Sequence, residues 1–102
     1  MTPEGGIKRK MRDWLSVNGI YYANVAGGAF SKPGDPDIIA DVDGRFLAIE
    51  AKTKTGRQSE QQKVCQRKVE ESGGMYIVAR CLQDVVEAVN TLRRSRDGKT
   101  AQ

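Results

Sequence analysis

Two carboxylates and a lysine stand at the ends of two short apolar runs. Asp37 precedes the first run, Glu50 lies near the end of the second, and Lys52 follows Glu50 by two residues. The dipeptide Asp43-Gly44 between the runs suits a two-residue type I′ turn, because Asp and Gly tolerate the positive φ that it requires. Counting outward from this turn pairs Asp37 with Glu50, with Cβ atoms roughly 4.5–5.5 Å apart. Lys52 shares their face, since side chains alternate along a strand.

Facing carboxylates repel each other and should destabilise a hairpin. A divalent cation between Asp37 and Glu50 would offset that repulsion, and hard oxygen ligands on a short frame suit Mg²⁺ or Mn²⁺. The Lys52 ammonium could then orient a water or stabilise negative charge on a phosphate. The alternative is an exposed hairpin end with ordinary charged residues. The cross-strand register, the lysine and the apolar flanks favour the metal site.

The composition excludes several kinds of catalyst. The chain of 102 residues contains no histidine, which excludes Ser-His-Asp and Cys-His catalysis and a closed zinc site built from its own cysteines and histidines. We expect Cys65 and Cys81 to be buried thiols rather than a disulfide, as in a reducing compartment. The sequence has no signal peptide and no apolar run of membrane-spanning length, so we expect a cytoplasmic protein without a membrane partner.

Seventeen Lys and Arg residues outnumber 13 Asp and Glu residues, and the net charge of +4 favours a polyanionic partner such as nucleic acid. The basic residues form several clusters, each of which alone could be a solvated helix face. Together they suggest a rim that binds the phosphates of DNA around the acidic site. The candidates for this rim are Lys8, Arg12, Lys32, Lys54, Arg57 and Lys63.

The patterning predicts an α/β protein in one domain, residues 1–94, with a flexible tail over 95–102. We expect helices over about 2–18, 59–72 and 83–94, and strands over 20–25, 37–42, 45–51 and 75–79. A hairpin followed by a β-α-β crossover gives a mixed four-stranded sheet, with helices on both faces.

Two residues have a structural explanation beside a functional one. Ser59-x-x-Gln62 is a capping box, in which Gln62 bonds back to the start of its helix. Glu4 is an acid in a first helical turn, where it complements the helix dipole.

The spacing of Pro36-Asp37, twelve residues, and then Glu50-Ala51-Lys52 resembles the PD-(D/E)XK nuclease signature. With Gly34 before it and Ser59-x-x-Gln62 after it, the chain is similar to the VRR-NUC (virus-type replication-repair nuclease) family. The resemblance implies a restriction-endonuclease-like core of order α-β-β-β-α-β-α. It also implies an Ala51 carbonyl as a further metal ligand, Glu4 as an added carboxylate, and Gln62 beside the active site.

The function we expect is a metal-dependent, structure-selective DNA endonuclease that requires Mg²⁺ or Mn²⁺. Asp37, Glu50, Lys52 and Gln62 would form its catalytic site, with Lys52 in an electrostatic and orienting role. The resemblance points to branched DNA such as Holliday junctions or flaps, to DNA repair, and to a homodimer. A non-catalytic DNA-binding module and a scaffold with a coincidental motif are the alternatives.

Overall fold

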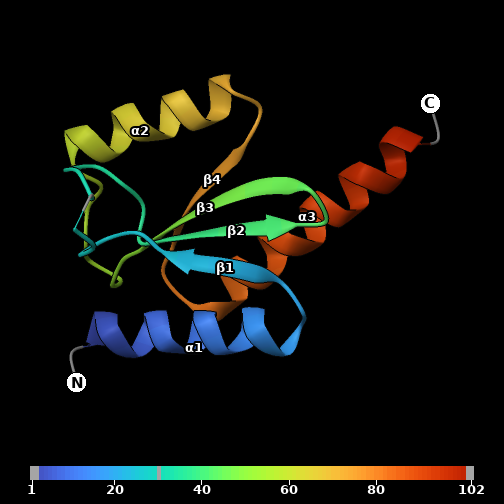
Figure 1. Ribbon diagram of the computed structural model, residues 1–102. Helices are drawn as coiled ribbons and strands as arrows, with labels where there is room; N and C mark the ends of the chain where they lie inside the picture. Colours follow the sequence, from blue (N-terminus) through green and yellow to red (C-terminus); the bar gives the residue numbers. More distant parts are fainter. Residues whose placement is uncertain (1–2, 30, 101–102) are drawn as a thin grey trace.

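The protein folds into one four-stranded sheet between two layers of helices (Figure 1). The computed structural model describes residues 3–29 and 31–100, and side chains only within residues 5–95. The predicted order α-β-β-β-α-β-α is confirmed. The elements are α1 (Pro3–Val17), β1 (Tyr21–Asn24), β2 (Ile38–Val42), β3 (Arg45–Ala51), α2 (Glu60–Glu71), β4 (Met75–Ala79) and α3 (Leu82–Thr100).

The sheet has the strand order β1-β2-β3-β4, so β2 and β3 are its inner strands. The pairs β1–β2 and β2–β3 are antiparallel, whereas β3 and β4 are parallel. A parallel pair needs a crossover connection, and α2 provides it. The sheet is therefore mixed, as the sequence predicted.

The turn between β2 and β3 sets the register of the hairpin. Asp43 and Gly44 have φ angles of 54° and 88°, as a type I′ turn requires. The pairs run from Val42 opposite Arg45 to Ile38 opposite Ile49. This is the register predicted from the sequence, and it places the residue before Ile38 level with the residue after Ile49.

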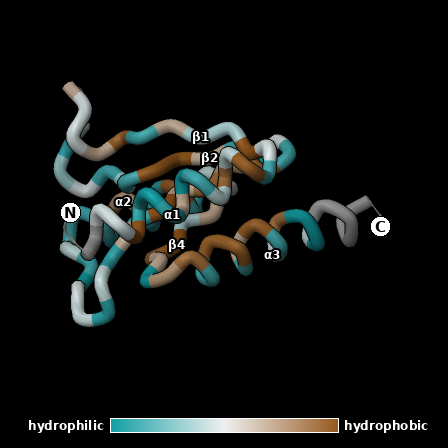
Figure 2. Tube along the Cα trace, turned by 90° about the horizontal axis from the view of Figure 1, so that it is seen from below, coloured by the Kyte–Doolittle hydropathy of each residue, from teal (hydrophilic) through white to brown (hydrophobic). Residues whose placement is uncertain are grey.

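The hydrophobic core lies on the sheet face that α1 and α3 cover. These two helices contact each other and pack on the strands, and Figure 2 shows apolar residues along β2 and along the part of α3 nearest the sheet. Alternate residues of the strands are buried here because their side chains share one face. The largest fully buried side chains are Met11, Leu15, Ile38, Val42, Leu47, Ile49, Val85 and Val89.

The opposite face is only partly covered. There α2 packs on β4, and Ala48 and Tyr76 are buried beneath it. The same face is open at Tyr21 on β1, which is 74% exposed, and partly open at Phe46 at the start of β3, which is 45% exposed. The sheet thus has helices on both faces, but only one face has an extensive core.

Several predicted boundaries and burials differ in the structure. β1 is shorter than the predicted strand over 20–25, and α3 begins at Leu82 rather than at residue 83 or 84. α3 continues to Thr100, past the boundary expected after residue 94 and past Leu92, the last of its residues in the core cluster. Residues 101 and 102 lie outside the described residues, and the flexibility of the tail stays a prediction.

Cys65 and Cys81 are free thiols, but only half-buried and exposed respectively, because neither faces the core. The prediction that both thiols are buried was therefore wrong. No helix in the described ranges is long and apolar enough to cross a membrane.

Replacing Leu47 by Ala should lower the free energy of unfolding by about 2–5 kcal/mol, because Leu47 is fully buried on the central strand β3. Phe46→Ala is the matched control, since Phe46 is adjacent but points to the open face. In urea denaturation, Phe46→Ala should lower the free energy of unfolding by less than half as much as Leu47→Ala. Equal losses would contradict the assignment of the two faces.

Candidate functional site

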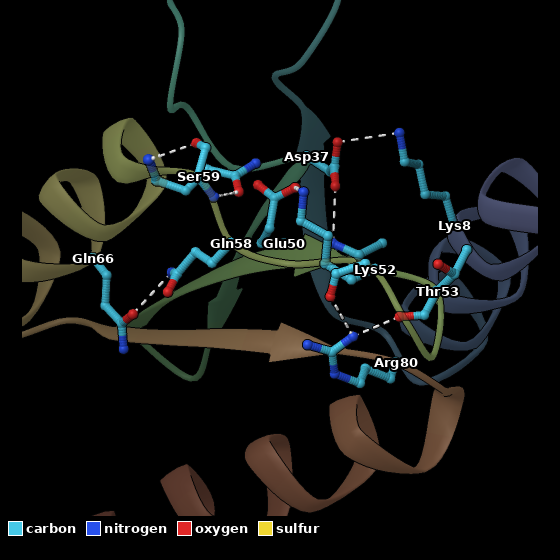
Figure 3. Close-up of polar contacts among 12 residues, drawn as sticks. Lys8, Asp37, Glu50, Lys52, Thr53, Gln58, Ser59, Gln66 and Arg80 are labelled. Atoms are coloured by element: carbon cyan, nitrogen blue, oxygen red, sulfur yellow. Dashed lines mark hydrogen bonds and ion pairs between the residues drawn. The ribbon is translucent and has the colours of Figure 1, made fainter.

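The backbone of Asp37 is fixed between two strands. Its N–H donates to the carbonyl of Ile49 at 3.0 Å, and its carbonyl accepts from the N–H of Val25 at 2.9 Å. Asp37 therefore continues the ladder one residue before β2 begins. Its side chain leaves the end of the sheet, between α1 and the connection that precedes α2 (Figure 3).

Both oxygens of the Asp37 carboxylate have partners. Oδ2 accepts a hydrogen bond from the Ala51 backbone N–H at 2.8 Å, and Oδ1 lies 3.1 Å from Nζ of Lys8 on α1. Asp37 is only 7% exposed, so these contacts compensate the cost of burying a charge. Lys8, which the sequence suggested as a DNA contact, thus points at the acidic site.

Glu50 is more deeply buried and less well paired. It is 3% exposed, and its Oε2 lies 3.7 Å from Nζ of Lys52. Its Oε1 has no hydrogen-bond partner among the described residues, although it is inaccessible to solvent. An unpaired buried carboxylate oxygen is costly, which points to a group that is missing from the protein chain itself.

Burial, and after it the negative charge of the neighbouring Asp37, raise the pKa of Glu50 to about 8, although Lys52 and Lys8 oppose the shift. Near neutral pH, Glu50 therefore holds a proton in the absence of another positive charge. Asp37 is then the charged carboxylate of the pair, and Lys8 lies against it.

The residues at this site fit a hard divalent cation. The two carboxylates and the nearby carbonyl of Ala51 are oxygen donors, which Mg²⁺ and Mn²⁺ prefer. The unpaired Oε1 of Glu50 supplies a vacant ligand position, and a cation could replace the proton on Glu50. The described residues contain no cluster of three or more His, Cys, Asp or Glu side chains. A magnesium ion would accordingly complete its shell with water and phosphate oxygens.

The structure describes the side chain of Gln62 but not that of Glu4. Glu4 lies on α1 one turn before Lys8, but its side chain is outside the described residues, so its role as a ligand stays a prediction. Gln62 completes the predicted capping box. Its Oε1 accepts from the N–H of Ser59 at 2.8 Å, and its N–H donates to Oγ of Ser59 at 3.1 Å. The cap is confirmed, whereas the catalytic role of Gln62 stays a prediction.

Gly34 connects the loop before Asp37 to α2. Its φ is +95°, and a Cβ atom there would lie only 2.6 Å from the carbonyl oxygen of Gln61 in the first turn of α2. Only glycine allows this close approach together with this backbone conformation. The glycine of the Gly34-x-Pro36-Asp37 motif thus brings the loop that carries Asp37 against the helix that carries Gln62.

The remaining candidate DNA contacts lie on α1, on α2 and in the loops before Asp37 and after Lys52. Arg12 is half-buried on α1, and the others are exposed: Lys32 before Asp37, Lys54 and Arg57 after β3, and Lys63 on α2. Lys63 forms an exposed ion pair with Glu60 at 3.3 Å, which contributes little to stability. Their contact with DNA stays a prediction.

The sequence analysis missed two cationic contacts at the site. One is the ion pair of Lys8 with Asp37. The other is Arg80, whose guanidinium binds backbone carbonyls of the loop that follows Lys52. Arg80 could have been recognised from the predicted crossover, since an arginine directly after β4 must lie near the residue directly after β3.

Comparison of structures finds a known protein with this fold, whereas comparison of sequences finds none. No protein-family model and no curated protein matches the chain. A solved structure described as a VRR_NUC domain superposes with a TM-score of 0.73, and the match covers 88% of this chain and 97% of that chain. The two chains are 16% identical, so the likeness shows a shared nuclease-like fold. The fold predicted from the motif resemblance is thereby confirmed.

The raised pKa of Glu50 predicts how stability depends on pH without metal. Because the folded-state pKa of about 8 lies above the ordinary 4.5, the folded protein binds this proton more tightly than the unfolded chain. The contribution of Glu50 to the free energy of unfolding is full below pH 4.5 and is lost as the pH rises to about 8. Urea denaturation across this window should show the loss, and Glu50→Gln should lack it. An identical pH profile for Glu50→Gln would contradict the shift.

Gly34→Ala should destabilise the protein through strain and overlap together, by about 2–4 kcal/mol. Gly27→Ala is the control, because Gly27 has a similar φ of +85° but no atom within 4 Å of the added Cβ. It should cost only the strain, about 1–2 kcal/mol. Urea denaturation measures the free energy of unfolding of both variants. An equal loss in Gly34→Ala and Gly27→Ala would show that the close approach to α2 does not affect stability.

Proposed function

We propose that this protein is a metal-dependent endonuclease that hydrolyses phosphodiester bonds in DNA. The observation that carries the proposal is the pair of buried carboxylates, Asp37 and Glu50, with the ammonium of Lys52 beside them. A protein with a purely structural role has no need to bury two carboxylates together and to leave one oxygen unpaired. The shared fold with a VRR_NUC domain supports the same activity.

In this proposal, Asp37, Glu50 and the Ala51 carbonyl hold Mg²⁺ or Mn²⁺. The cation would supply Lewis-acid stabilisation of the charge that develops on the phosphate. Lys52 orients the attacking water and stabilises that charge from the side of Glu50, 3.7 Å from Oε2. Lys8, whose ammonium lies 3.1 Å from Asp37, would also place a positive charge where a phosphate oxygen of DNA could bind beside the carboxylates.

We further propose that the surface around the site binds the DNA backbone without reading its sequence. The exposed Lys32, Lys54, Arg57 and Lys63, with Arg12 on α1, supply positive charge on the helices and loops that flank Asp37 and Glu50 in the chain or pack beside them. Binding through phosphates depends steeply on salt and carries no sequence information. Structure-selective cutting fits such a surface better than sequence-specific cutting.

Branched DNA, such as a Holliday junction or a flap, is the substrate class we propose, with a homodimer as the active form. Two sites related by a two-fold axis would suit a two-fold symmetric junction. The exposed Tyr21 and Phe46 on the open sheet face support this idea, because they leave apolar surface that a second copy could cover.

One observation favours a second candidate, a DNA-binding module without turnover. Both oxygens of Asp37 are already paired, one with Lys8 and one with the Ala51 N–H. A site neutralised by its own lysine could persist without a metal. The two candidates differ in one measurable respect, which is cutting in the presence of Mg²⁺ or Mn²⁺.

Labelled four-way junction, flap and linear duplex DNA should therefore be incubated with the protein and Mg²⁺ or Mn²⁺, or with EDTA. We expect metal-dependent cleavage of the branched substrates. Tight binding without cleavage under either metal would favour the binding module.

Asp37→Asn and Lys52→Ala should each lower the cleavage rate by about 100-fold or more, while DNA binding changes little. Lys10→Ala is the control, because it removes an exposed lysine of α1 outside the proposed site. Its rate should stay near that of the unmodified protein. Cleavage that survives both site substitutions would show that other residues carry the reaction.

A further inference from the structure

The loop between β3 and α2 begins beside the end of β4. In the parallel register Ala51 pairs with Ala79, so the residues that follow them, Lys52 and Arg80, emerge side by side. The N–H of Lys52 donates to the carbonyl of Ala79 at 2.9 Å. The lysine of the site is thus fastened by its backbone to the strand that leads into Arg80.

The side chain of Arg80 reaches across this loop. Its Nη1 donates to the carbonyl of Thr53 at 2.5 Å and to that of Gly56 at 2.7 Å, and it lies 3.3 Å from the carbonyl of Lys54 (Figure 3). The backbone N–H of Arg80 donates to Oδ2 of Asp84 at 2.8 Å. Arg80 is therefore anchored to the first turn of α3, while its guanidinium gathers three carbonyls of one turn.

The loop that Arg80 binds folds back onto Lys52. The N–H of Gly56 donates to the carbonyl of Thr53 at 3.2 Å, which closes the turn. A Cβ atom at Gly56 would lie 3.4 Å from Cδ of Lys52, so the Gly56 backbone lies close to the aliphatic part of that side chain. The Lys52 side chain is accordingly only 17% exposed, and its ammonium is directed to Glu50.

We propose that Arg80 is a positioning residue, whose guanidinium holds the turn Thr53–Gly56 against the stem of Lys52 and thereby keeps the Lys52 ammonium beside Glu50. Charge-assisted hydrogen bonds to carbonyls are roughly twice as strong as neutral ones, which suits a clamp on exposed backbone. The inference rests on the proposed function in one respect, namely that Lys52 acts on the phosphodiester.

A direct contact of Arg80 with DNA is the competing explanation, because Arg80 is exposed beside other basic residues. The two explanations predict different kinetic effects. A lost phosphate contact weakens DNA binding, whereas a displaced Lys52 lowers the rate of the chemical step at saturating DNA. A misplacement of about 1 Å at a reacting group can cost about 100-fold in rate.

The first experiment measures single-turnover cleavage and DNA affinity for Arg80→Ala. We expect the saturated rate to fall by about 10- to 100-fold, and the dissociation constant for DNA to change by less than about 2-fold. Adding methylguanidinium should restore part of the rate in Arg80→Ala but none in Lys52→Ala. Weakened DNA binding with an unchanged saturated rate would overturn the proposal.

The matched control is Arg93→Ala. Arg93 is a half-exposed arginine that also fastens a turn, through Asp43 at 3.0 Å, but at the opposite end of the hairpin. Its removal changes the net charge by the same amount and should leave the saturated rate within about 2-fold. If Arg80→Ala does not fold, Arg80→Lys gives the same comparison, because its shorter side chain cannot reach all three carbonyls.

The second experiment needs neither metal nor DNA. Trypsin can cut after Lys54 and Arg57 only when the loop opens, and fragment masses identify the bond that is cut. Arg80→Ala should accelerate these cuts by about 10-fold, whereas Arg93→Ala should not. Faster loop cutting in a protein without nuclease activity would refute the proposed function and keep the clamp. Nuclease activity with unchanged loop cutting would refute the clamp alone.

Discussion

The structure depends on the burial of two carboxylates at one end of the β2–β3 hairpin. Asp37 and Glu50 are 7% and 3% exposed, so neither can rely on water to stabilise its charge. The chain supplies a proton on Glu50, the ammoniums of Lys8 and Lys52, and the N–H of Ala51. These groups compensate the burial only in part, since one oxygen of Glu50 stays unpaired. The site therefore keeps one buried carboxylate oxygen that a cation could bind in place of the proton on Glu50.

The elements around this pair hold it from different directions. The core between the sheet, α1 and α3 keeps β3 rigid, and α1 brings Lys8 to Asp37. Gly34 lets the loop before Asp37 approach α2 closely, and Arg80 ties the loop after Lys52 to the start of α3. All three helices thus contribute to a site whose charged residues come mainly from one hairpin. Such support from several elements is what a precisely positioned catalytic group requires.

Local patterns in the sequence predicted much of this arrangement. Asp43-Gly44 predicted the turn and hence the register, and Ser59-x-x-Gln62 predicted the start of α2. Both signals involve residues at most three positions apart in the chain. The direction of Lys8 and the reach of Arg80 could not be predicted in the same way. Each contact joins residues more than 20 positions apart, and it depends on how the helices and strands pack. The likeness to a VRR_NUC domain confirms the fold, and the roles of the site residues stay predictions.

The type I′ turn has a consequence for how this hairpin can evolve. The turn lies at the far end of β2 and β3, where Asp43 and Gly44 are exposed, and it should tolerate those substitutions that accept a positive φ, such as Asp43→Asn. A change in its length is a different matter. Inserting or deleting one residue shifts the strand pairing and turns every side chain of one strand to the other face. Asp37 and Glu50 would then point to opposite sides of the sheet, so insertions and deletions at this remote turn should be eliminated as strictly as substitutions at the site itself.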